Sequence, residues 1–468
     1  MAIKKEPRKS NLSVNRFLLH KYDRPGPRYT SYPTVPEWSE KFGPDDYIRD
    51  LREASRCDEP LSLYVHIPFC RARCFYCGCN SCVVRNETRV EEYLARIEQE
   101  LKLVRTYLDR RNRLSQMHWG GGTPTFLNIK QLSRLFNVVK DVFCFDSQAE
   151  LAIELDPRVT SGEQLTLLAG LGFNRVSLGV QDFTEKVQRA IGRNQTWEQT
   201  EKVFLACRQL GFTGINIDLI YGLPYQSTAD FSRTVERVIG LGADRVAVYS
   251  YAHLPQMKLN QLKIDATALP GTELKYDLFA TAVELFLQAG YVQIGMDHFA
   301  RPGDDLARAL AKGALHRNFM GYTPKVTSDM LSLGMSAISN INGCFAQNTS
   351  QLDGYMKVIA SGRPAVYRGW RLSRDDKIRQ WVILSLMCNF VLDFKKLSER
   401  FAVDYYDYFP EENNDLEEFI NDGLLERKEH RLLVKPEGRI FVRNIAMVFD
   451  IYLRKKQPGQ KPLFSRTI

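Results

Sequence analysis

The sequence predicts an α/β fold built as a partial or full (β/α) barrel. Short apolar segments alternate with longer amphipathic ones, which is the pattern of βαβ units around a parallel sheet. Six such units follow one another from residue 61, and that number favours a barrel. The unusual polar motifs all fall where a predicted strand ends, the face on which barrel enzymes place their active sites. A doubly wound open sheet is the alternative architecture.

The predicted elements follow from the hydrophobic period of each segment. Strands of alternating or continuous apolar character are expected at 61–67, 115–119, 149–155, 174–180, 213–220 and 244–250. Helices with apolar residues three or four apart are expected at 88–108, 129–143, 163–172, 196–211, 229–242 and 272–290. Each strand is therefore followed by one helix, as a parallel sheet requires.

Two flanking regions complete the predicted domain organisation. Residues 1–55 include "KYDRPGPRYTSYPT", whose prolines and aromatics predict an arm packed on the barrel. Residues 56–365 form the predicted catalytic barrel, with a linker near 361–370. Residues 366–468 form a mostly helical domain in which 424–449 resembles the hairpin and helix of a winged helix. DNA binding is one interpretation, but "VRNIAMVFDIYL" is apolar, which favours a small domain that caps the barrel.

Composition limits the partners and the compartment. The N-terminus "MAIKKEPRKSNLSVNRF" has no apolar run of the signal-peptide type, and no segment approaches the roughly 20 apolar residues of a membrane span. We therefore expect a cytoplasmic protein. The net charge is +9, but the bases are dispersed. An acidic small molecule held in a cleft suits this charge, and no nucleic-acid partner is expected.

Four cysteines crowd the loop after the first predicted strand, in "CRARCFYCGCN". In a reducing compartment such a cluster indicates metal binding or catalysis rather than disulfides. Cys70, Cys74 and Cys77 are spaced so that three thiolates can converge on one small object. An iron–sulfur cluster used only for electron transfer takes four thiolates, whereas three leave one iron free to bind a substrate.

Cys79 and zinc are the alternatives at this loop. Only Gly78 separates Cys79 from Cys77, and such close residues do not easily reach adjacent corners of one cluster, so we expect Cys79 not to be a ligand. A zinc site with all four cysteines remains open, although structural zinc commonly uses two separated pairs.

The neighbouring motifs extend the pattern into a resemblance. The spacing C-x3-C-x2-C with Tyr76 before the last cysteine resembles the signature loop of the radical S-adenosylmethionine superfamily. "GGGTPT" (120–125), after the second predicted strand, resembles the glycine-rich stretch of that superfamily. Glycines there let backbone groups approach a ligand closely. The resemblance implies a radical-SAM-type barrel with a [4Fe–4S] cluster.

Further stretches narrow the resemblance to one family. The chain is similar to the oxygen-independent coproporphyrinogen III oxidases (coproporphyrinogen dehydrogenases) from residue 22 to 390 and again in the tail "NIAMVFDIYLR". The arm motif and "CGCN" distinguish these oxidases from shorter, related haem chaperones. The similar stretches are "YDRPGPRYTSYPT", "LYVHIPFC", "CGCN", "HWGGGTPT", "IELDPR", "GVQDF", "NIDLIYGLP", "YAHLP", "GMDHFAR", "LHRNFMGYT" and "CNF".

The resemblance implies site residues one by one. The cluster ligands would be Cys70, Cys74 and Cys77. The first S-adenosylmethionine molecule would be contacted by Tyr64, Gly121, Glu154 and Ile338. A second molecule would be contacted by Tyr76, Gly122, Thr123, Gln181, Arg193, Asp218 and Ala252, with Tyr76 where the family often has Phe. Their residue types suit this, since carboxylates accept hydrogen bonds from ribose and Arg pairs with a carboxylate. His253 and His298 are left out of the predicted site.

The resemblance also implies a reaction and partners. One electron, from a reduced donor such as a flavodoxin or ferredoxin, would let the cluster split S-adenosylmethionine and form a 5′-deoxyadenosyl radical. That radical would take a hydrogen atom from two propionates of coproporphyrinogen III, each of which loses CO2 and becomes a vinyl group in haem biosynthesis. The aromatic arm would close over the barrel mouth, and the family suggests a monomer. A haem chaperone, a haem-opening radical methyltransferase and a zinc or DNA-binding regulator are the rival interpretations.

Overall fold

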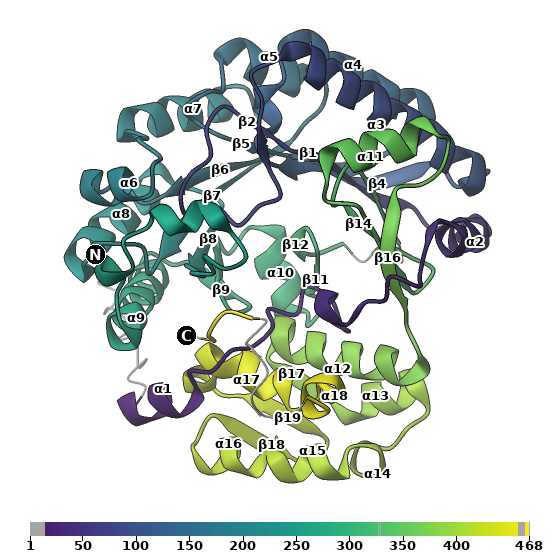
Figure 1. The fold of residues 1–468 in the computed structure, drawn as a ribbon. Coiled ribbons are helices and arrows are strands. Elements are labelled where there is room, and N and C mark those ends of the chain that lie inside the picture. The colour runs from purple at the N-terminus through teal and green to yellow at the C-terminus, as the bar shows by residue number, and fades with distance from the viewer. Residues whose placement is uncertain (1–14, 326, 328, 457–463, 468) are drawn as a thin grey trace, which may run out of the picture.

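The chain folds around one curved sheet in the computed structural model, which describes residues 15–325, 327, 329–456 and 464–467. The sheet has 12 strands in the order β16-β15-β14-β13-β1-β4-β5-β6-β7-β8-β10-β9. Figure 1 shows it as an arc with helices along its outer side. The six predicted strands are β1 (Leu61–Ile67), β4 (Arg113–Gly121), β5 (Cys144–Leu155), β6 (Arg175–Gln181), β7 (Gly214–Tyr221) and β8 (Arg245–Ser250).

The order of these six strands decides between the two predicted architectures. Each is parallel to the next, and they stand in the sheet in chain order. A doubly wound sheet reverses its order at a switch point, whereas right-handed crossovers without a reversal put every helix on the same face. The outer helices are α3 (Glu87–Leu108), α4 (Ile129–Val142), α5 (Gly162–Gly170), α6 (Glu185–Ala190), α7 (Trp197–Gln209), α8 (Thr228–Leu241) and α9 (Thr272–Gln288). The barrel prediction is confirmed, in its partial form.

Side-chain alternation along the strands separates an apolar outer face from a polar inner one. In β7, Ile215, Ile217 and Leu219 are fully buried, while Asn216 and Asp218 alternate with them and face the lumen. Because successive side chains of a strand point to opposite faces, the same rule places His118 of β4 inside and Trp119 outside. The lumen is therefore lined by polar groups, and the main core lies between sheet and helices.

Capping side chains fix where the outer helices begin. Ser161 and Gln164 form a reciprocal capping box at α5, and Thr196 and Gln199 form another at α7. Each box satisfies two backbone N–H groups that the first helical turn leaves without partners. The box at α5 ends the loop that follows β5, and the box at α7 ends the loop between α6 and α7.

Further strands extend the sheet at both edges. Beyond β1 lies β13 (Met330–Leu333), which is parallel to β1, followed by the antiparallel strands β14 (Ile338–Ile341), β15 (Cys344–Asn348) and β16 (Val366–Arg371). Beyond β8 lie β10 (His298–Ala300) and β9 (Val292–Ile294). The chain passes between the two edges through α10 (Asp305–Ala311) and a hairpin, β11 (His316–Asn318) and β12 (Gly321–Thr323), which lie inside the arc. The predicted linker at 361–370 is wrong in part, because 366–371 is the edge strand β16 and the sheet extends past residue 365.

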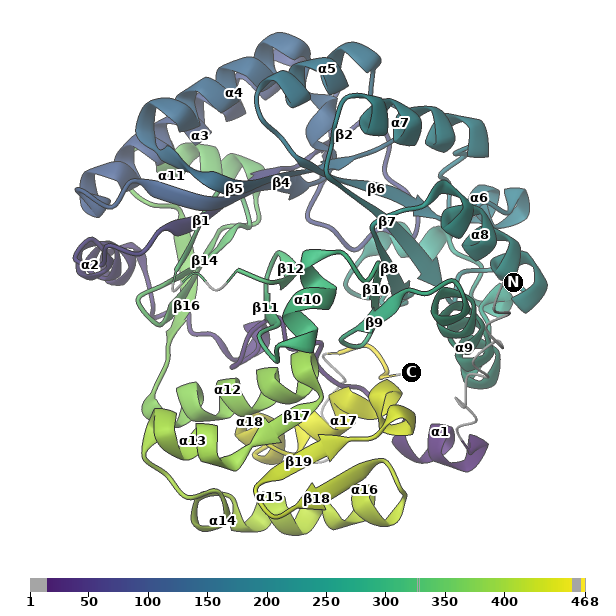
Figure 2. The ribbon, with the colours of Figure 1, turned by 180° about the vertical axis from the view of Figure 1, so that it is seen from behind.

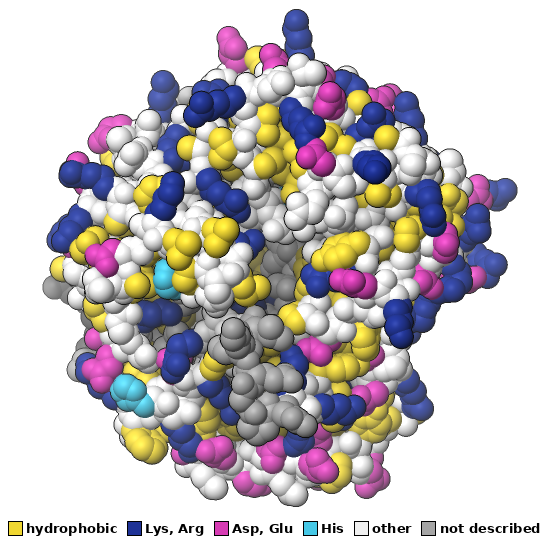
Figure 3. Space-filling view, in the orientation of Figure 1, with side chains coloured by type: hydrophobic (Ala, Val, Ile, Leu, Met, Phe, Trp, Pro, Cys, Tyr) yellow, Lys and Arg dark blue, Asp and Glu magenta, His cyan; other side chains and the backbone are white. Residues whose placement is uncertain are grey.

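The C-terminal region lies across the open side of the arc (Figures 1 and 2). Its strands form a separate three-stranded sheet, β17-β19-β18, beside α12. The elements are α12 (Arg374–Asn389), β17 (Val391–Asp393), α13 (Phe394–Phe401), α14 (Tyr405–Tyr408), α15 (Pro410–Asp415), α16 (Glu417–Asn421), β18 (Leu425–Lys428), β19 (Arg431–Val434), α17 (Val442–Met447) and α18 (Ile451–Arg454). Figure 3 shows Lys and Arg dispersed among Asp and Glu on the face it presents.

The N-terminal arm joins the C-terminal region to the barrel. Its described part holds α1 (Arg16–Tyr22) and α2 (Pro44–Ala54), while residues 1–14 lie outside the described part. Tyr22, Tyr29 and Tyr32 are buried in the same apolar cluster as the C-terminal helices. Trp38 stacks on Phe345 of the barrel sheet. The aromatics that predicted a packed arm are thus the contacts that hold it, and they reach both domains.

No helix in the described part of the chain is long and apolar enough to cross a membrane.

Arg443 of α17 is one of several buried polar links between the arm and the C-terminal region. Its buried guanidinium donates to the carbonyl oxygens of Gly26 and Pro27, the latter at 3.0 Å, and burial lowers its pKa to about 9.

We predict that Arg443→Met lowers the free energy of unfolding by about 2–3 kcal/mol, because two carbonyls lose charged donors. It should also expose the arm to limited proteolysis. Arg431→Ala, at an exposed position of β19, is the control, and equal denaturation midpoints for both variants would refute the prediction.

Candidate active site

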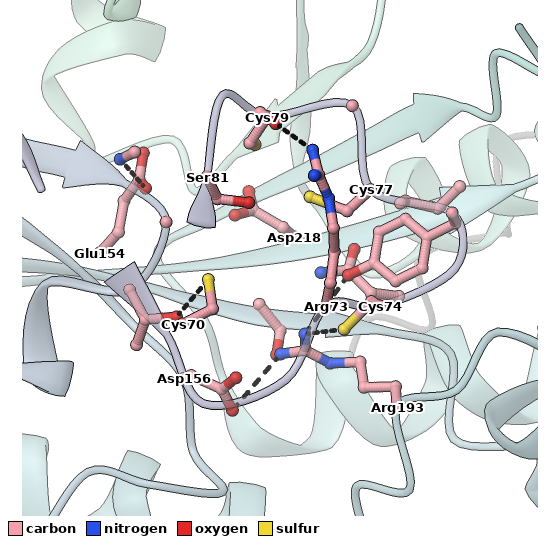
Figure 4. Close-up of a pocket in the computed structure, with 18 of the residues that line it drawn as sticks. Cys70, Arg73, Cys74, Cys77, Cys79, Ser81, Glu154, Asp156, Arg193 and Asp218 are labelled. Atoms are coloured by element: carbon pink, nitrogen blue, oxygen red, sulfur yellow. Dashed lines mark hydrogen bonds and ion pairs between the residues drawn. The ribbon is translucent and has the colours of Figure 1, made fainter. Parts of the chain in front are cut away.

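A cavity of about 660 Å³ opens at the carboxyl ends of the parallel strands. That volume lies within the range of small-molecule sites. Figure 4 shows the labelled cysteines, carboxylates and arginines around it. Of the predicted site residues, those that line it are Cys70, Cys74, Tyr76, Cys77, Gly121, Gly122, Thr123, Glu154, Gln181, Arg193, Asp218 and Ala252. Tyr64 and Ile338 are not among its lining residues.

The cysteine loop is held in place by hydrogen bonds from neighbouring loops. Two short strands, β2 (Phe69–Cys70) and β3 (Cys82–Val83), pair and close the loop at its base. The loop after β6 accepts a bond from the Phe75 N–H at the Ile191 carbonyl, 2.9 Å away. Asn260 donates to the carbonyls of Cys74, Phe75 and Cys77 at 3.2, 3.0 and 2.9 Å. The loop conformation is therefore built into the barrel.

Two guanidinium groups approach one of the thiols. Arg158 and Arg193 each place a nitrogen 3.7 Å from the Cys74 sulfur. Asp156 pairs with Arg158 at 2.6 Å and with Arg193 at 3.6 Å, and so fixes both cations. Both guanidinium groups can therefore donate to the Cys74 sulfur, and the thiolate is the form of cysteine that binds metals.

The other thiols differ in their surroundings. A hydrogen bond from the Cys79 thiol lowers the pKa of Cys77 to about 6, whereas burial raises the pKa of Cys70 to about 11. The Cys70 sulfur lies 3.6 Å from the Thr123 hydroxyl of the glycine-rich turn. Cys79 itself lines the same cavity and is exposed.

The glycine-rich turn needs its glycines for contact with the protein itself. A Cβ on Gly121 would lie 2.6 Å from the His66 ring, at a φ of +119° that side chains rarely adopt. A Cβ on Gly122 would lie 2.6 Å from the Pro68 carbonyl. The Gly122 N–H donates to Ile67 at 2.8 Å, so the turn packs against the entry of the cysteine loop. Contacts within the protein, with the Glu154 carboxylate at Gly120, the His66 ring at Gly121 and the Pro68 carbonyl at Gly122, thus explain "GGG" without a ligand.

Glu154 stands at the end of β5 with its carboxylate held from two sides. Its Oε1 lies 3.3 Å from His118 Nε2, and its Oε2 accepts from the Gly121 N–H at 3.0 Å. Burial alone would raise the pKa of Glu154, but the interaction with His118, together with the bond from Gly121 and the nearby His66, keeps the pKa below its ordinary value. Glu154 is therefore an ionised acceptor at the cavity wall.

Asp218, on β7, behaves in the opposite way. Burial, with the negative charge of Glu154 added, raises its pKa to about 6, against bonds of 2.8 Å from Asn216 and 3.0 Å from Ser177. The two carboxyl groups of this cavity thus differ in how readily they ionise. Glu154 ionises easily, whereas ionising Asp218 is unfavourable because the group is buried near another negative charge.

Tyr64, His253 and His298 are not among the residues that line this cavity. The Tyr64 hydroxyl is 3.1 Å from His66 Nδ1, and its ring stacks on His118. His298 lines the inner lumen 2.7 Å from Asp297, and His253 bonds Tyr251 at 3.0 Å. Ile338 lies on β14 beside the apolar cluster of Trp38 and Phe345. Its contact with a ligand stays a prediction.

Some cavity residues escaped the sequence prediction. Arg158 lies in the quoted "IELDPR", and Arg28 lies in "PGPRYTSYPT", but no pattern marked either as part of the site. Arg28 reaches the cavity from the arm and donates to the Ser250 carbonyl at 3.0 Å. Asn260 follows no motif, because its role depends on a contact with residues 183–186 positions earlier.

Two family models and several named relatives match this chain. The Radical SAM superfamily model matches residues 64–238, and the HemN C-terminal domain model matches 372–441. The oxygen-independent coproporphyrinogen III oxidase of Escherichia coli (strain K12) is 45% identical over 96% of this chain and 98% of the relative. Its namesake in Helicobacter pylori (strain ATCC 700392 / 26695) is 38% identical over 96% and 98%. This chain belongs to the oxygen-independent coproporphyrinogen III oxidase family.

A solved structure of the family supports the fold. "Coproporphyrinogen III oxidase (HemN) from Escherichia coli is a Radical SAM enzyme" has a TM-score of 0.88 at 44% identity, over 94% of this chain and 99% of that one. The namesake in Pseudomonas aeruginosa is 44% identical over 93% and 95%. The enzyme class is therefore that of the radical S-adenosylmethionine oxidases, and the predicted family is confirmed.

Family membership implies a [4Fe–4S] cluster and S-adenosylmethionine, and the residues present fit both. Four thiols, those of Cys70, Cys74, Cys77 and Cys79, line one cavity, and two guanidinium groups lie beside Cys74; thiolates are the ligands of such clusters. Among the described residues, no three His, Cys, Asp or Glu side chains are grouped to hold a single metal ion. Each thiolate of a four-iron cluster binds its own iron, so its ligands are spread around the cluster.

Cys77 is a proposed cluster ligand and Cys79 is not, so we predict that their serine variants differ in iron content. We expect Cys79→Ser to keep about four irons per chain after anaerobic reconstitution, because three thiolates remain. Cys77→Ser should lose most of its iron. Iron and sulfide analysis with absorption spectra would measure both variants, and an iron-free Cys79→Ser protein would make Cys79 a ligand.

The raised pKa of Asp218 predicts a change of stability with pH. Because this pKa moves from 3.8 to about 6 on folding, ionisation penalises the folded state. The penalty is absent below about pH 4 and complete above about pH 6. Asp218→Asn should therefore raise the free energy of unfolding by about 1–3 kcal/mol at pH 7, with the gain shrinking as the pH falls towards 4. Urea titrations at several pH values would measure this, and a gain independent of pH would contradict it.

Proposed function

We propose that this chain converts two propionate side chains of coproporphyrinogen III to vinyl groups and so forms protoporphyrinogen IX in haem biosynthesis. The observation that carries the proposal is the convergence of Cys70, Cys74 and Cys77 on one cavity at the mouth of a family-typical barrel. Each propionate loses a hydrogen atom, CO2 and one electron. When bound, the cluster and S-adenosylmethionine supply the radical chemistry that removes the hydrogen atom.

The residues around the cavity orient the cofactors. Glu154, ionised between His118 and Gly121, offers a carboxylate to an ammonium or ribose hydroxyl. Tyr64 and Ile338 complete the proposed set for the first S-adenosylmethionine. Gly121, at its positive φ, lets the backbone turn at the cavity wall, where it would contact that molecule.

A second S-adenosylmethionine would occupy the wall formed by β6, β7 and β8. Gln181, Asp218 and Ala252 lie on this wall beside Arg193, all lining the cavity. The proposed set is completed by Tyr76, Gly122 and Thr123. Arg193 donates to the Tyr76 hydroxyl at 3.3 Å, so that hydroxyl adds a bond that a Phe lacks.

The arm and the protein's charge suit the acidic substrate. Arg28 is the arm residue that lines the cavity, and its guanidinium can pair with a carboxylate. We propose that the arm closes the mouth and keeps water away from the reaction. We also propose a cytoplasmic monomer reduced by a flavodoxin or ferredoxin. No observation favours the haem chaperone, because the matched relatives described above carry the name of the oxidase.

Anaerobic turnover tests the proposed function. The reconstituted protein is mixed with dithionite, S-adenosylmethionine and coproporphyrinogen III, and the products are separated by chromatography. Divinyl porphyrin together with 5′-deoxyadenosine is the expected result. Haem binding without any vinyl product would refute the proposal and favour a chaperone.

The second S-adenosylmethionine predicts a binding stoichiometry. Anaerobic equilibrium dialysis should find about two molecules per chain in the reconstituted protein. Ala252→Leu, which fills the second wall, should lower this number to about one while the iron content stays unchanged. A value of one in the unchanged protein would remove the second molecule from the proposal.

A further inference from the structure

Three large apolar side chains are exposed together on the segment 257–263, which follows β8 and contains a short 3₁₀ helix, Leu259–Lys263. Met257 is 59% exposed, Leu259 73% and Leu262 67%. Single exposed apolar residues are common, but a contiguous group on one segment marks an interaction surface. The remaining exposed large apolar residues in the described part of the chain lie on other elements.

The same segment is bonded directly to the cysteine loop. The Asn260 side-chain amide donates to the carbonyls of Cys74 and Cys77, two of the proposed cluster ligands. Gln261 Nε2 donates to the Tyr76 carbonyl at 2.9 Å. One hydrogen-bonded side chain therefore lies between the exposed leucines and the backbone of the cluster ligands.

Cations surround this apolar group. Lys263 lies 5.1 Å from the centre of the Phe75 ring, and Lys258 donates to Asn80 Oδ1 at 3.3 Å. Arg71 and Arg73 belong to the adjacent cysteine loop. None of these four has an ion pair with another described residue. Asp265, two residues beyond the segment, accepts bonds of 2.9 and 2.7 Å from Thr267 that lower its pKa, so it stays ionised and sets one negative charge against the four cations. The surface is thus apolar at its centre and basic at its edge.

We propose that the segment 257–263, with Arg71 and Arg73, is the docking surface for a small acidic protein that carries one electron. The inference rests on the proposed function, because a cluster that splits S-adenosylmethionine would need one electron from a donor outside this chain. In the step, one electron leaves the reduced prosthetic group of the carrier and enters the cluster, with no bond formed or broken. Apolar contact supplies affinity, and opposite charges speed and orient the encounter.

The charges disfavour two other occupants. The first 14 residues, "MAIKKEPRKSNLSV", hold four Lys or Arg and one Glu, so they would be repelled. A second copy of the chain carries a net charge of +9 and would be repelled as well. An anionic membrane also suits an apolar, basic surface. Membrane binding would not explain, however, why this surface is hydrogen-bonded through Asn260 to the proposed cluster ligands.

The experiment compares two electron donors, because dithionite needs no docking surface whereas a carrier protein does. The test uses the double variant Leu259→Asp/Leu262→Asp and the single variant Lys263→Glu, each reconstituted in the full chain. Leu205→Asp and Lys202→Glu are matched controls, because both residues are exposed on α7. Turnover is measured with dithionite and with a purified, reduced flavodoxin of acidic surface. Affinity for that flavodoxin is measured by calorimetry at low and high salt.

We expect dithionite-driven turnover to stay unchanged in all variants. With flavodoxin, kcat/KM for the carrier should fall about tenfold or more in the double variant and about threefold in Lys263→Glu. The controls should match the unchanged protein, and salt should weaken binding of the unchanged protein more than that of Lys263→Glu.

Three results are each decisive. Flavodoxin-driven turnover that is equal in the double variant and its controls would overturn the docking surface and leave the proposed function intact. Binding to phosphatidylglycerol vesicles that the double variant loses, with unchanged flavodoxin kinetics, would overturn it in favour of a membrane. No turnover of the unchanged protein with dithionite would instead refute the proposed function.

Discussion

The alternation of side chains along six parallel strands is the constraint on which the rest of the structure depends. Because every second residue faces the lumen, each strand presents an apolar face to the helices and a polar face to the interior. Leu151 and Ile153 thus lie in the core, while Glu150 and Glu154 of the same strand face inward. A one-residue slip of any strand would exchange these faces, so the packing of the core also sets the chemistry of the lumen.

Groups at the site are held by contacts from the parts of the chain that close the barrel mouth. The cysteine loop accepts bonds from Asn260 and Gln261, and Asp156 holds the two arginines beside Cys74. On the open side, the arm reaches the cavity with Arg28 while its tyrosines are buried against the C-terminal helices. The arm is therefore part of what shapes the cavity, and the C-terminal helices hold the arm in place.

The cavity shows how function and stability compete. Asp218 ionises against burial and against Glu154, a cost that the folded chain carries without a bound ligand. The exposed leucines at 259 and 262 carry a similar cost, since apolar surface is left in water. The proposed partners, a nucleotide in one case and a protein in the other, would account for both costs.

The sequence alone determined the six βα units, the parallel sheet and the cysteine spacing, because hydrophobic period and local spacing are properties of short segments. It also indicated the positions of Glu154, Gln181 and Asp218, because the ends of parallel strands meet at one edge. Only the tertiary structure decided that the barrel stays open, that residues 366–371 join its sheet, and that Arg28, Arg158 and Asn260 belong to the site. Those features depend on contacts between residues far apart in the chain, and no local pattern records which distant partner a side chain will meet.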